Sequence, residues 1–560
     1  MITIKFPKKK NLQNKFYLLQ SKKSQWISLG ITLIFMLIAF YIFIPAIHVK
    51  NFSFWLFLLA TVVGYVLVNG IICAIHRERP NLKPAIIMMA GLVGIMLLGT
   101  VAGLRIWHAK RYASILKIEE GDKKDIPSVE GASSIALMDT ASAEKLGDRK
   151  IGSLTDVVSQ FNVGPYTQID YQSSPTKVAA LQYEGFFKWW GNHKEGVPGY
   201  VKVNPVTMAA DYVPLKEKMR YVPSAYFNDD LSRRIRFRFP TVMFENLHFE
   251  IDEQGNPWYV ATTYDHTISL FGGKKVTGAI LVNPITGDMK QLGLKDIPQW
   301  MDVVFHGDLL MKQYNDAVQL HKGFWNSIFG QKDCRQTTTV KVKDDDGDSS
   351  YKADYGYVAK NGDIWVFTGV TSVNGDSSNI GFMMANERTG KTRFIMASGA
   401  DEGSAMHSAE GEVQEKGYHA SFPSLINVDG TPTYIMVLKD NSGLVKQYAC
   451  VNVEQYNLVV TASNQKDVID RYRRLMKGEI TADEAKKSGE SQIDTSKFVD
   501  KTIQVKKLEK IDIGGNTHLY ILDTEGKIYQ AKYADVLKML SVKEGDKITI
   551  QTDGKNYLIK

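Results

Sequence analysis

An acidic run is the first part of the chain whose residue types suggest chemistry. Closely spaced aspartates supply the carboxylate oxygens that Ca²⁺ prefers as ligands. A calcium loop of the EF-hand type that began at Asp344 would need glycine at its sixth position and glutamate at its twelfth, but Ser349 and Tyr355 stand there. We therefore expect an exposed hairpin tip, with metal binding at Asp344, Asp346 and Asp348 as the alternative.

A second candidate is a set of hydrolase-like residue types at a spacing of three. Ser404, His407 and Glu410 would lie near one face of a helix. A nucleophile and its base on one helix rarely reach the geometry that catalysis needs, and we expect Ser404 to be a helix N-cap. Histidines never occur in a paired His-x-x-x-His spacing and no Cys-x-x-Cys is present. The sequence therefore predicts no catalytic residue and no cofactor.

Two short segments gather bulky aromatic side chains that could bind a partner. One lies between Gly323 and Gly330, and the other follows Gly185. Aromatic residues dominate the energetics of interfaces, but clusters of them also build cores. We expect core packing between modules, with contact to a partner or to the membrane surface as the alternative. The interaction candidates are Phe324, Trp325, Phe329, Trp189 and Trp190, with Phe186 and Phe187 beside the last two.

Positive charge is concentrated near the N-terminus. The chain carries 68 Lys+Arg and 60 Asp+Glu, and residues 1–108 hold 12 of these basic residues against the single acid Glu78. The remainder is therefore 56 minus 59, or −3, which makes nucleic acid an unexpected partner. The four arginines between positions 233 and 238 are expected to form a solvated face, with polyanion binding as the alternative.

The elements that must position these residues begin with membrane spans. A length of 560 residues predicts several domains. Three uncharged stretches, 24–47, 51–75 and 84–104, are each long enough to cross a bilayer as a helix. They contain no Asp, Glu, Lys or Arg, which disfavours a self-contained pump. We expect all three to span the membrane.

The distribution of Lys and Arg predicts the orientation of these spans. The first 25 residues hold seven lysines and no acid, and Arg77, Arg79 and Lys83 lie between the second and third spans. The loop between the first two spans has only Lys50. The positive-inside rule then places residues 1–24 in the cytoplasm and residues 109–560 outside, behind an uncleaved signal anchor. With three cysteines in all, the composition fits the outer face of a Gram-positive membrane.

Span three also carries the small-xxx-small pair Gly99/Gly103. This spacing allows close approach of helix backbones. We expect packing within the three-helix unit, with homo-oligomer formation through span three as the alternative. In the region outside, a bridge between Cys334 and Cys450 stays open, because spacing alone cannot decide it.

An internal repeat organises the middle of the chain. Each copy predicts a strand that runs into an Asn-type turn and a return strand, with Gly287 and Gly390 available for left-handed positions. A glycine turn at Gly255, Gly362 or Gly430 precedes the later copies and predicts a hairpin. Helical segments are expected at 229–238, 308–320, 405–415 and 467–476. The copies are Gly199–Asn204–Thr207, Gly278–Asn283–Thr286, Gly381–Asn386–Thr389 and a degenerate fourth that keeps only Asn452.

This order of helix and antiparallel strands, with a final strand ending in Val-Asn-Pro-x-Thr-Gly, resembles the PepSY type of small α+β module. The match is best over residues 282–287, where Asn283 replaces the usual Asp. The chain as a whole also resembles large membrane-anchored proteins of Gram-positive bacteria. The PepSY resemblance implies an extracytoplasmic, non-catalytic domain associated with peptidase regulation or envelope signalling, and it transfers no catalytic residue.

The last part of the chain follows a polar linker. Residues 498–560 predict three strands, a short helix and two strands, which is the order of an OB-like small barrel, with an SH3-like barrel as the alternative. The predicted fold class is thus a three-helix transmembrane anchor with repeated α+β modules and a C-terminal β-barrel. The predicted parts are 1–24, 25–108 (spans), 109–477 (repeats), 478–497 (linker) and 498–560 (barrel).

Taken together, these features predict a non-enzymatic, membrane-anchored scaffold or binding protein of the cell envelope. Its expected partners are the lipid bilayer and an envelope protein, peptide or glycan. One alternative is an enzyme that acts on cell-wall polymer or peptide through a site assembled between modules, for which a deep pocket with perturbed carboxylates would be the sign. Another is an accessory subunit of a transport or secretion complex.

Overall fold

The computed structural model separates the chain into two units, one through Lys486 and one from Lys487. The aspartate run at 344–348 lies outside the described residues, so the calcium and hairpin-tip predictions stay predictions. The described residues are 18–128, 135, 137, 140–343, 349–353, 355–374, 378–486, 499–513, 516–531, 543–552 and 557–559.

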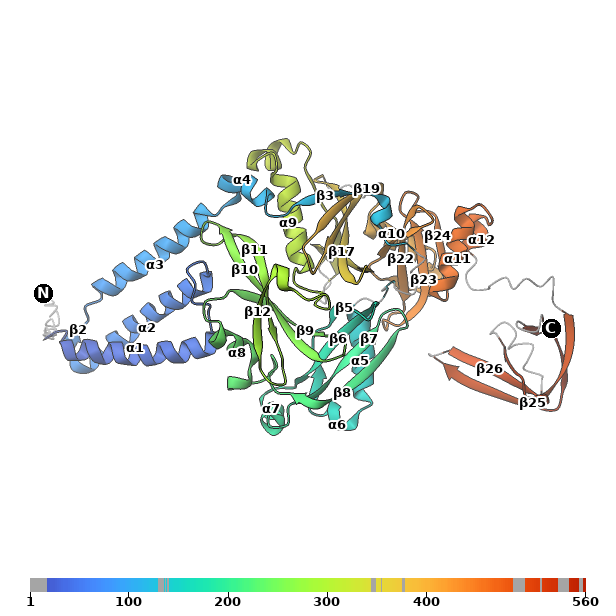
Figure 1. Cartoon of the computed structure of the whole chain (residues 1–560), viewed down its shortest axis with the longest axis horizontal. Coiled ribbons are helices and arrows are strands. Elements are labelled where there is room, and N and C mark those ends of the chain that lie inside the picture. Colours follow the sequence, from blue (N-terminus) through green and yellow to red (C-terminus); the bar gives the residue numbers. More distant parts are fainter. Residues whose placement is uncertain are drawn as a thin grey trace, which may run out of the picture. The chain divides into compact units, whose positions relative to one another are not determined.

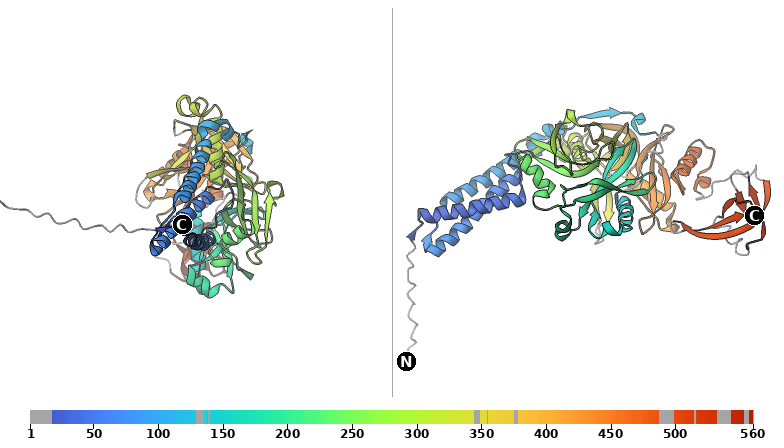
Figure 2. Two further views of the ribbon diagram at one scale, coloured as in Figure 1. Left: turned by 90° about the vertical axis from the view of Figure 1, so that its left-hand side faces the viewer. Right: turned by 60° about the horizontal axis from the view of Figure 1, so that its bottom comes forward.

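The first unit begins with three apolar helices, α1 (Lys22–Phe43), α2 (Phe52–His76) and α3 (Lys83–Ala102) (Figure 1). Each is long and apolar enough to cross a membrane, which confirms the three predicted apolar helices. Helix α2 contacts both of the others, and α1 and α2 lie side by side in every view (Figure 2). Polar side chains are paired inside this bundle, where the Ser28 hydroxyl donates to the side-chain oxygen of Asn69 at 3.1 Å.

The two ends of this bundle contact different parts of the chain. At one end, β1 (Leu18–Leu19) pairs with β2 (Glu78–Arg79). At the other, the backbone N–H of Ile47 donates to the carbonyl of Pro240 at 2.8 Å. The β1–β2 pair and the contact with Pro240 therefore lie at opposite ends of the helix bundle.

Residues 118–486, here called the α/β region, contain four antiparallel meanders that follow one another along the chain. The accessory strands β3 (Ile118–Gly121), β4 (Phe161–Val163), β13 (Arg335–Thr337) and β20 (His419–Ala420) extend three of these sheets, while β14 (Thr339–Lys343) and β15 (Ser349–Ala353) pair separately. Each meander has four strands, one more than the three or so expected. The meanders are β5–β8 (Thr167–Tyr171, Ser174–Tyr183, Val197–Asn204, Ala209–Met219), β9–β12 (Phe244–Ile251, Pro257–Ile268, Gly272–Val282, Met289–Gly293), β16–β19 (Gly356–Lys360, Asp363–Ser372, Ser378–Asn386, Thr392–Ala400) and β21–β24 (Ser424–Val428, Thr431–Lys439, Val445–Asn452, Val459–Ala462).

The repeated Asn marks the same turn in every meander, at the end of the third strand. The side-chain oxygen of Asn283 accepts from the N–H groups of Ile285 and Thr286 at 2.9 and 3.2 Å. Equivalent bonds form at Asn204, Asn386 and Asn452, so the fourth copy is confirmed. An Asn side chain stabilises such a turn because it can replace a backbone acceptor.

The repeated glycine also has a physical cause. A Cβ atom at Gly199, Gly278 or Gly381 would lie under 3.0 Å from a carbonyl oxygen of the returning fourth strand, which is too close for any side chain. In the fourth meander, the pairing of β23 with β24 stops at Tyr448, so Gln447 faces no fourth strand. Glycine is therefore required only where the two strands continue side by side.

The first hairpin of each meander shows what the sequence pattern missed. Gly255, Gly362 and Gly430 all adopt positive φ in this turn, as predicted. The first meander uses Gln172 and Ser173 instead, with φ of 53° and 60°. Non-glycine residues seldom adopt this conformation, so the sequence offered no signal for the turn.

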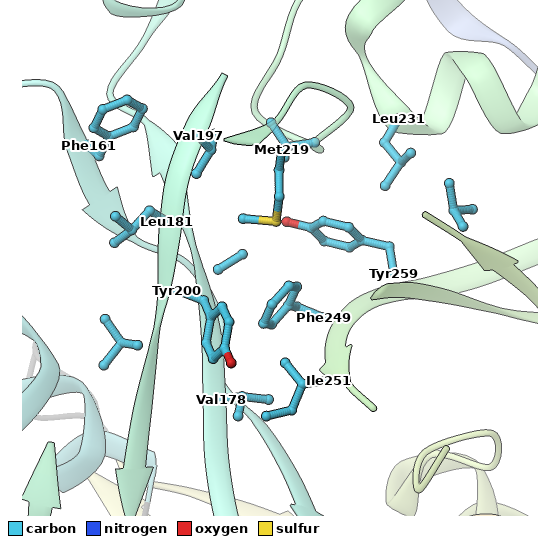
Figure 3. Close-up of a cluster of buried hydrophobic side chains, with 14 of the residues drawn as sticks. Phe161, Val178, Leu181, Val197, Tyr200, Met219, Leu231, Phe249, Ile251 and Tyr259 are labelled. Carbon is cyan, nitrogen blue, oxygen red and sulfur yellow. The ribbon is translucent and has the colours of Figure 1, made fainter. Parts of the chain in front are cut away.

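The helices fill the spaces around the sheets, and neighbouring sheets share cores. Figure 3 shows side chains of the first two meanders packed together, with the rings of Tyr200 and Tyr259 each 5.5 Å from that of Phe249. The third and fourth meanders share a second core around Phe382 and Tyr434. The helices are α4 (Arg105–Ala113), α5 (Thr140–Gly152), α6 (Thr155–Val158), α7 (Phe186–Asn192), α8 (Leu231–Arg238), α9 (Gly307–Leu320), α10 (Glu402–Gly411), α11 (Gln465–Met476) and α12 (Ala482–Lys486).

The C-terminal unit is one five-stranded antiparallel sheet. Its long strand β25 (Val499–Ile513) pairs with β26 (Asn516–Asp523) through one half and with β28 (Lys547–Thr552) through the other. Strands β27 (Ile528–Ala531) and β29 (Tyr557–Ile559) form the edges. Among the described residues of this unit the sheet does not close, so the predicted barrel is not confirmed.

Candidate functional site

The hairpin between β10 and β11 reaches the membrane helices at its tip. The ring of Phe271 lies 5.2 Å from that of Phe52, the first residue of α2. A Cβ atom at Gly99 in α3 would lie 2.8 Å from the side chain of Leu270. The small residues of span three thus make room for this tip, and the prediction that Gly99 and Gly103 pack within the three-helix unit is wrong.

Polar contacts hold the hairpin tip from two further sides. The Lys50 ammonium pairs with Asp265 at 2.8 Å and donates to the His266 carbonyl at 2.6 Å. The guanidinium of Arg111 in α4 donates to the carbonyl of Thr267 at 2.5 Å. The tip is therefore fixed between the α1–α2 loop, the end of α3 and helix α4.

A cleft of about 870 Å³ opens beside this tip, between α4 and α9. We call it the membrane-end cleft, because its floor includes the residues that directly follow α3. A concave site of this size suits a small molecule or the end of a larger one. It is lined by Gly103–Ile106, Tyr112, Ile115, Glu245, Asn246, His266, Phe271–Lys274, His306, Asp308, Leu309, Lys312, Gln313, Asp316 and Phe324.

The cleft carries charges of both signs. Arg105 pairs with Asp316 at 2.9 Å, and Lys274 pairs with Glu245. Burial raises the pKa of Asp316, although Arg105 opposes the shift. On the same wall, Lys312 is exposed and lies one helical turn after Asp308. The site can therefore receive a polar group through either charge.

Two histidines of the cleft have ring nitrogens that bond to nothing in the described structure. These atoms are Nδ1 of His266 and Nε2 of His306. Burial lowers the pKa of both imidazoles, to about 3 for His306. Both rings are therefore neutral near pH 7, and the unbonded nitrogen of each is buried in the wall of the cleft.

Two buried acidic side chains that are not part of the cleft lining hold the loop that leads into α9. Glu250 accepts from the N–H groups of Asp302 and Val303, both at 3.0 Å, and bonds His248 at 2.9 Å. Glu387 accepts from the N–H of Gly307 at 3.0 Å. Glu250 and Glu387 are at most 2% exposed, so they act as acceptors for backbone groups and do not reach the cleft.

The three residues of the hydrolase-like trio make separate local contacts within helix α10 and beside it. The N-cap is Asp401, whose carboxylate accepts from the Ser404 N–H at 2.7 Å, so the prediction of Ser404 as N-cap is wrong. The His407 ring bonds the carbonyl of Gly403 at 2.7 Å. Glu410 accepts from the N–H of Ala420 at 2.9 Å. These contacts leave the three side chains apart from one another, and no triad forms.

Two of the four arginines of α8 do not belong to the solvated face that was predicted for them. Arg236 is 5% exposed and donates to the carbonyls of Ile44 and Val242 at 3.0 and 2.5 Å. Arg233 donates to the carbonyl of Tyr41 at 2.9 Å. Cations at a helix C-terminus stabilise its unpaired carbonyls, so these arginines cap α1 and join it to the α/β region.

Replacing Arg236 with methionine should destabilise this junction. The change keeps the length of the side chain but removes its charged hydrogen bonds, so we expect a loss of about 2–4 kcal/mol in the free energy of unfolding. Thermal unfolding of the full chain in detergent measures it. Arg238→Met is the matched control, because Arg238 is exposed and bonds no carbonyl of α1 in the described residues. Equal melting of the two variants would contradict the capping role.

The aromatic candidates separate by exposure. Trp325 and Phe329 are 59% and 77% exposed, so the expected core packing of this segment is wrong, while Phe324 lines the membrane-end cleft. Trp189 is 4% exposed and belongs to the core of the first two meanders, so it is not an interaction residue. Its neighbour Trp190 is exposed.

The cysteines and possible metal ligands add no further site among the described residues. Cys334 and Cys450 are both buried free thiols, so no bridge joins them. No group of three His, Cys, Asp or Glu residues in the described part of the chain has metal-binding geometry. The cleft is the feature that remains, and its residues come from segments far apart in sequence.

Comparison with known proteins identifies no family. No family model and no curated protein matches the chain. Among solved structures, a variant of B. megaterium levansucrase aligns with 9% identity over 81% of this chain and 93% of that one, at a TM-score of 0.17. An exo-β-1,3-galactanase from Clostridium thermocellum aligns with 8% identity over 70% and 87%, at a TM-score of 0.14. Similarity at this level carries no conclusion about fold or function.

Proposed function

We propose that this chain is a membrane-anchored binding protein of the cell envelope, with its α/β region on the outer side and its ligand in the membrane-end cleft. One observation carries the proposal: the cleft places two ion pairs and the exposed Lys312 beside apolar side chains. Such groups recognise a ligand with a polar end, and Leu104, Ile106 and Phe271 offer it an apolar flank.

Binding is favoured over catalysis by the chemistry of the lining. The cleft contains no Ser, Thr or Cys side chain that could act as a nucleophile. Asp316 and Glu245 are each engaged by a cation. A base with a pKa of about 3, as at His306, accepts protons poorly near neutral pH. The lining of this cleft therefore offers neither a hydroxyl or thiol nucleophile of the usual kind nor an imidazole base at neutral pH.

The modular part of the proposal is a scaffold of PepSY-like units followed by an OB-like module. The repeated turn at Asn283 and its equivalents supports the first assignment. The strand order β27-β26-β25-β28-β29 supports the second, because an OB barrel places its first strand between the second and the fourth. Both would serve as further contact surfaces for an envelope protein, peptide or glycan.

Native mass spectrometry of the full chain, purified from envelope membranes in nanodiscs, tests the cleft. The parent should carry a reproducible bound species, and Lys312→Glu should lower its occupancy about fivefold, because it reverses an exposed charge on the cleft wall. Lys216→Glu, an equally exposed site on β8, should leave occupancy unchanged. No bound species, or equal occupancy in both variants, would refute the proposal.

Two further measurements test the remaining parts. A chain that ends at Lys486 keeps the cleft, so it should retain the bound species; loss of that species would assign binding to the C-terminal unit. Protease added to intact cells should digest the α/β region if it lies outside, as the positive-inside rule predicts. Its protection would overturn the orientation.

A further inference from the structure

A group of aromatic rings in mutual contact lies on α7 and on the turn before α8. We call it the aromatic platform, and its members are Phe186, Phe187, Trp189, Trp190, Tyr226 and Phe227. Phe186 packs 5.2 Å from Tyr226, and Trp189 packs 5.7 Å from Phe227. Trp189 is buried beneath the others as their base. The outer rings face solvent, since Phe187 is 84%, Trp190 60% and Phe227 53% exposed.

Direct contacts join the platform to the end of α1. The Tyr41 hydroxyl, in the last turn of that helix, donates to the side-chain oxygen of Asn228 at 3.0 Å. Arg233 bridges the two sides, because it donates to the carbonyl of Tyr41 at 2.9 Å and to that of Phe227 at 2.5 Å. The platform is thus fixed at the boundary where α1 leaves the membrane.

A neighbouring contact reaches further along the span. Phe237 of α8 is 53% exposed, and its ring lies 6.1 Å from those of Phe40 and Tyr41 in α1. Figure 1 shows α8 at the end of this helix. An exposed ring from the α/β region therefore contacts residues within the apolar helix α1. This contact places α8 at the depth of the bilayer surface.

The chemistry of the platform suits that depth. Trp and Phe rings collect at membrane interfaces, where an apolar face meets the headgroups. Lys188 and Lys194 flank the rings and can attract lipid headgroups, while Glu184 and Glu195 lie on the same segment. In water, the same exposed patch would leave several large apolar side chains uncovered.

We propose that the aromatic platform inserts into the interfacial layer of the same bilayer that α1 crosses. It would act as a fourth attachment point, which fixes the first meander against the membrane surface. The occupant is lipid, and the proposal is independent of any ligand in the membrane-end cleft.

Site-specific quenching in nanodiscs tests this insertion. The full chain carrying Phe187→Cys is labelled with a polarity-sensitive fluorophore and reconstituted with anionic and zwitterionic phospholipids that bear a quencher near the headgroup. The native cysteines are buried, and parent protein treated with the same fluorophore corrects for any labelling of them. The matched control is Glu415→Cys, an exposed position beside α10 that contacts no span in the described structure.

The label at 187 should lose about half of its emission to the shallow quencher, while the label at 415 should be almost unaffected. Adding Trp190→Asp and Phe227→Asp should restore most of that emission, because carboxylates partition poorly into the bilayer. Equal quenching at 187 and 415 would overturn the proposal. A second result would also overturn the proposal. If an aqueous quencher reached the label at 187 in nanodiscs but not in native membranes, a protein and not lipid would cover the platform.

Discussion

The Gly278→Ala variant should unfold at a much lower temperature than the parent, although it adds one methyl group. The new Cβ atom would fall under 3.0 Å from the backbone oxygen of Leu292, and both atoms belong to paired strands that cannot separate without losing hydrogen bonds. We expect a loss of about 3 kcal/mol or more in the free energy of unfolding. Gly381→Ala should behave alike, because its Cβ would meet the backbone oxygen of Ile395.

Thermal unfolding of the purified full chain in one detergent measures this effect. Gly411→Ala is the matched control, because a Cβ at that position at the end of α10 meets nothing within 4 Å. Its free energy of unfolding should stay within about 0.5 kcal/mol of that of the parent. If Gly278→Ala melted together with Gly411→Ala, the strand crowding that explains the repeat would be wrong.

Stability should fall as the pH rises from about 5 to about 9, because buried carboxyls must ionise. Burial raises the pKa of Glu387 to about 8 and that of Glu402 to about 7, each against a normal value of 4.5. With a raised pKa, the folded state binds more protons than the unfolded state. The stabilisation is therefore complete below pH 4.5 and is lost as the pH passes through 7 and 8.

The contacts of the two carboxyls explain why they stay in place. Glu402 accepts from the Thr338 hydroxyl at 2.8 Å and from the Gly369 N–H at 2.5 Å, which ties α10 to the third sheet. The amide oxygen of a glutamine can accept one of these hydrogen bonds, and the amide does not ionise. Glu387→Gln should consequently flatten the fall of melting temperature with pH, whereas Glu415→Gln on the surface should preserve it. An unchanged slope in Glu387→Gln would contradict this assignment.

The pH effect bears on the cleft, because one of these acids, Glu387, positions part of its wall. Glu387 binds the backbone where α9 begins, and that helix supplies Asp308 and Lys312 to the lining. The hairpin tip at Phe271 supplies the opposite wall and also contacts α2 and α3. A ligand in the cleft would therefore touch elements that are fastened to the membrane helices.

The sequence by itself determined the features that depend on neighbouring residues. The three apolar helices follow from about twenty apolar residues in a row, because the ability of a helix to cross a bilayer depends on its composition and length. The repeat follows from Asn283 and its equivalents, because each Asn bonds backbone groups only two or three residues ahead. The hairpin at Gly362 likewise depends on a local conformation that glycine tolerates.

Only the tertiary structure decided which side chains meet across the chain. Trp189 and Trp190 are adjacent tryptophans, yet Trp189 packs into the core that the first two meanders share, whereas Trp190 is exposed on the same helix. Arg236 finds its acceptors at Ile44, and Gly99 meets Leu270. The membrane-end cleft is assembled in the same way, from α4, the β10–β11 tip and α9, and no spacing along the chain encodes distances between such segments.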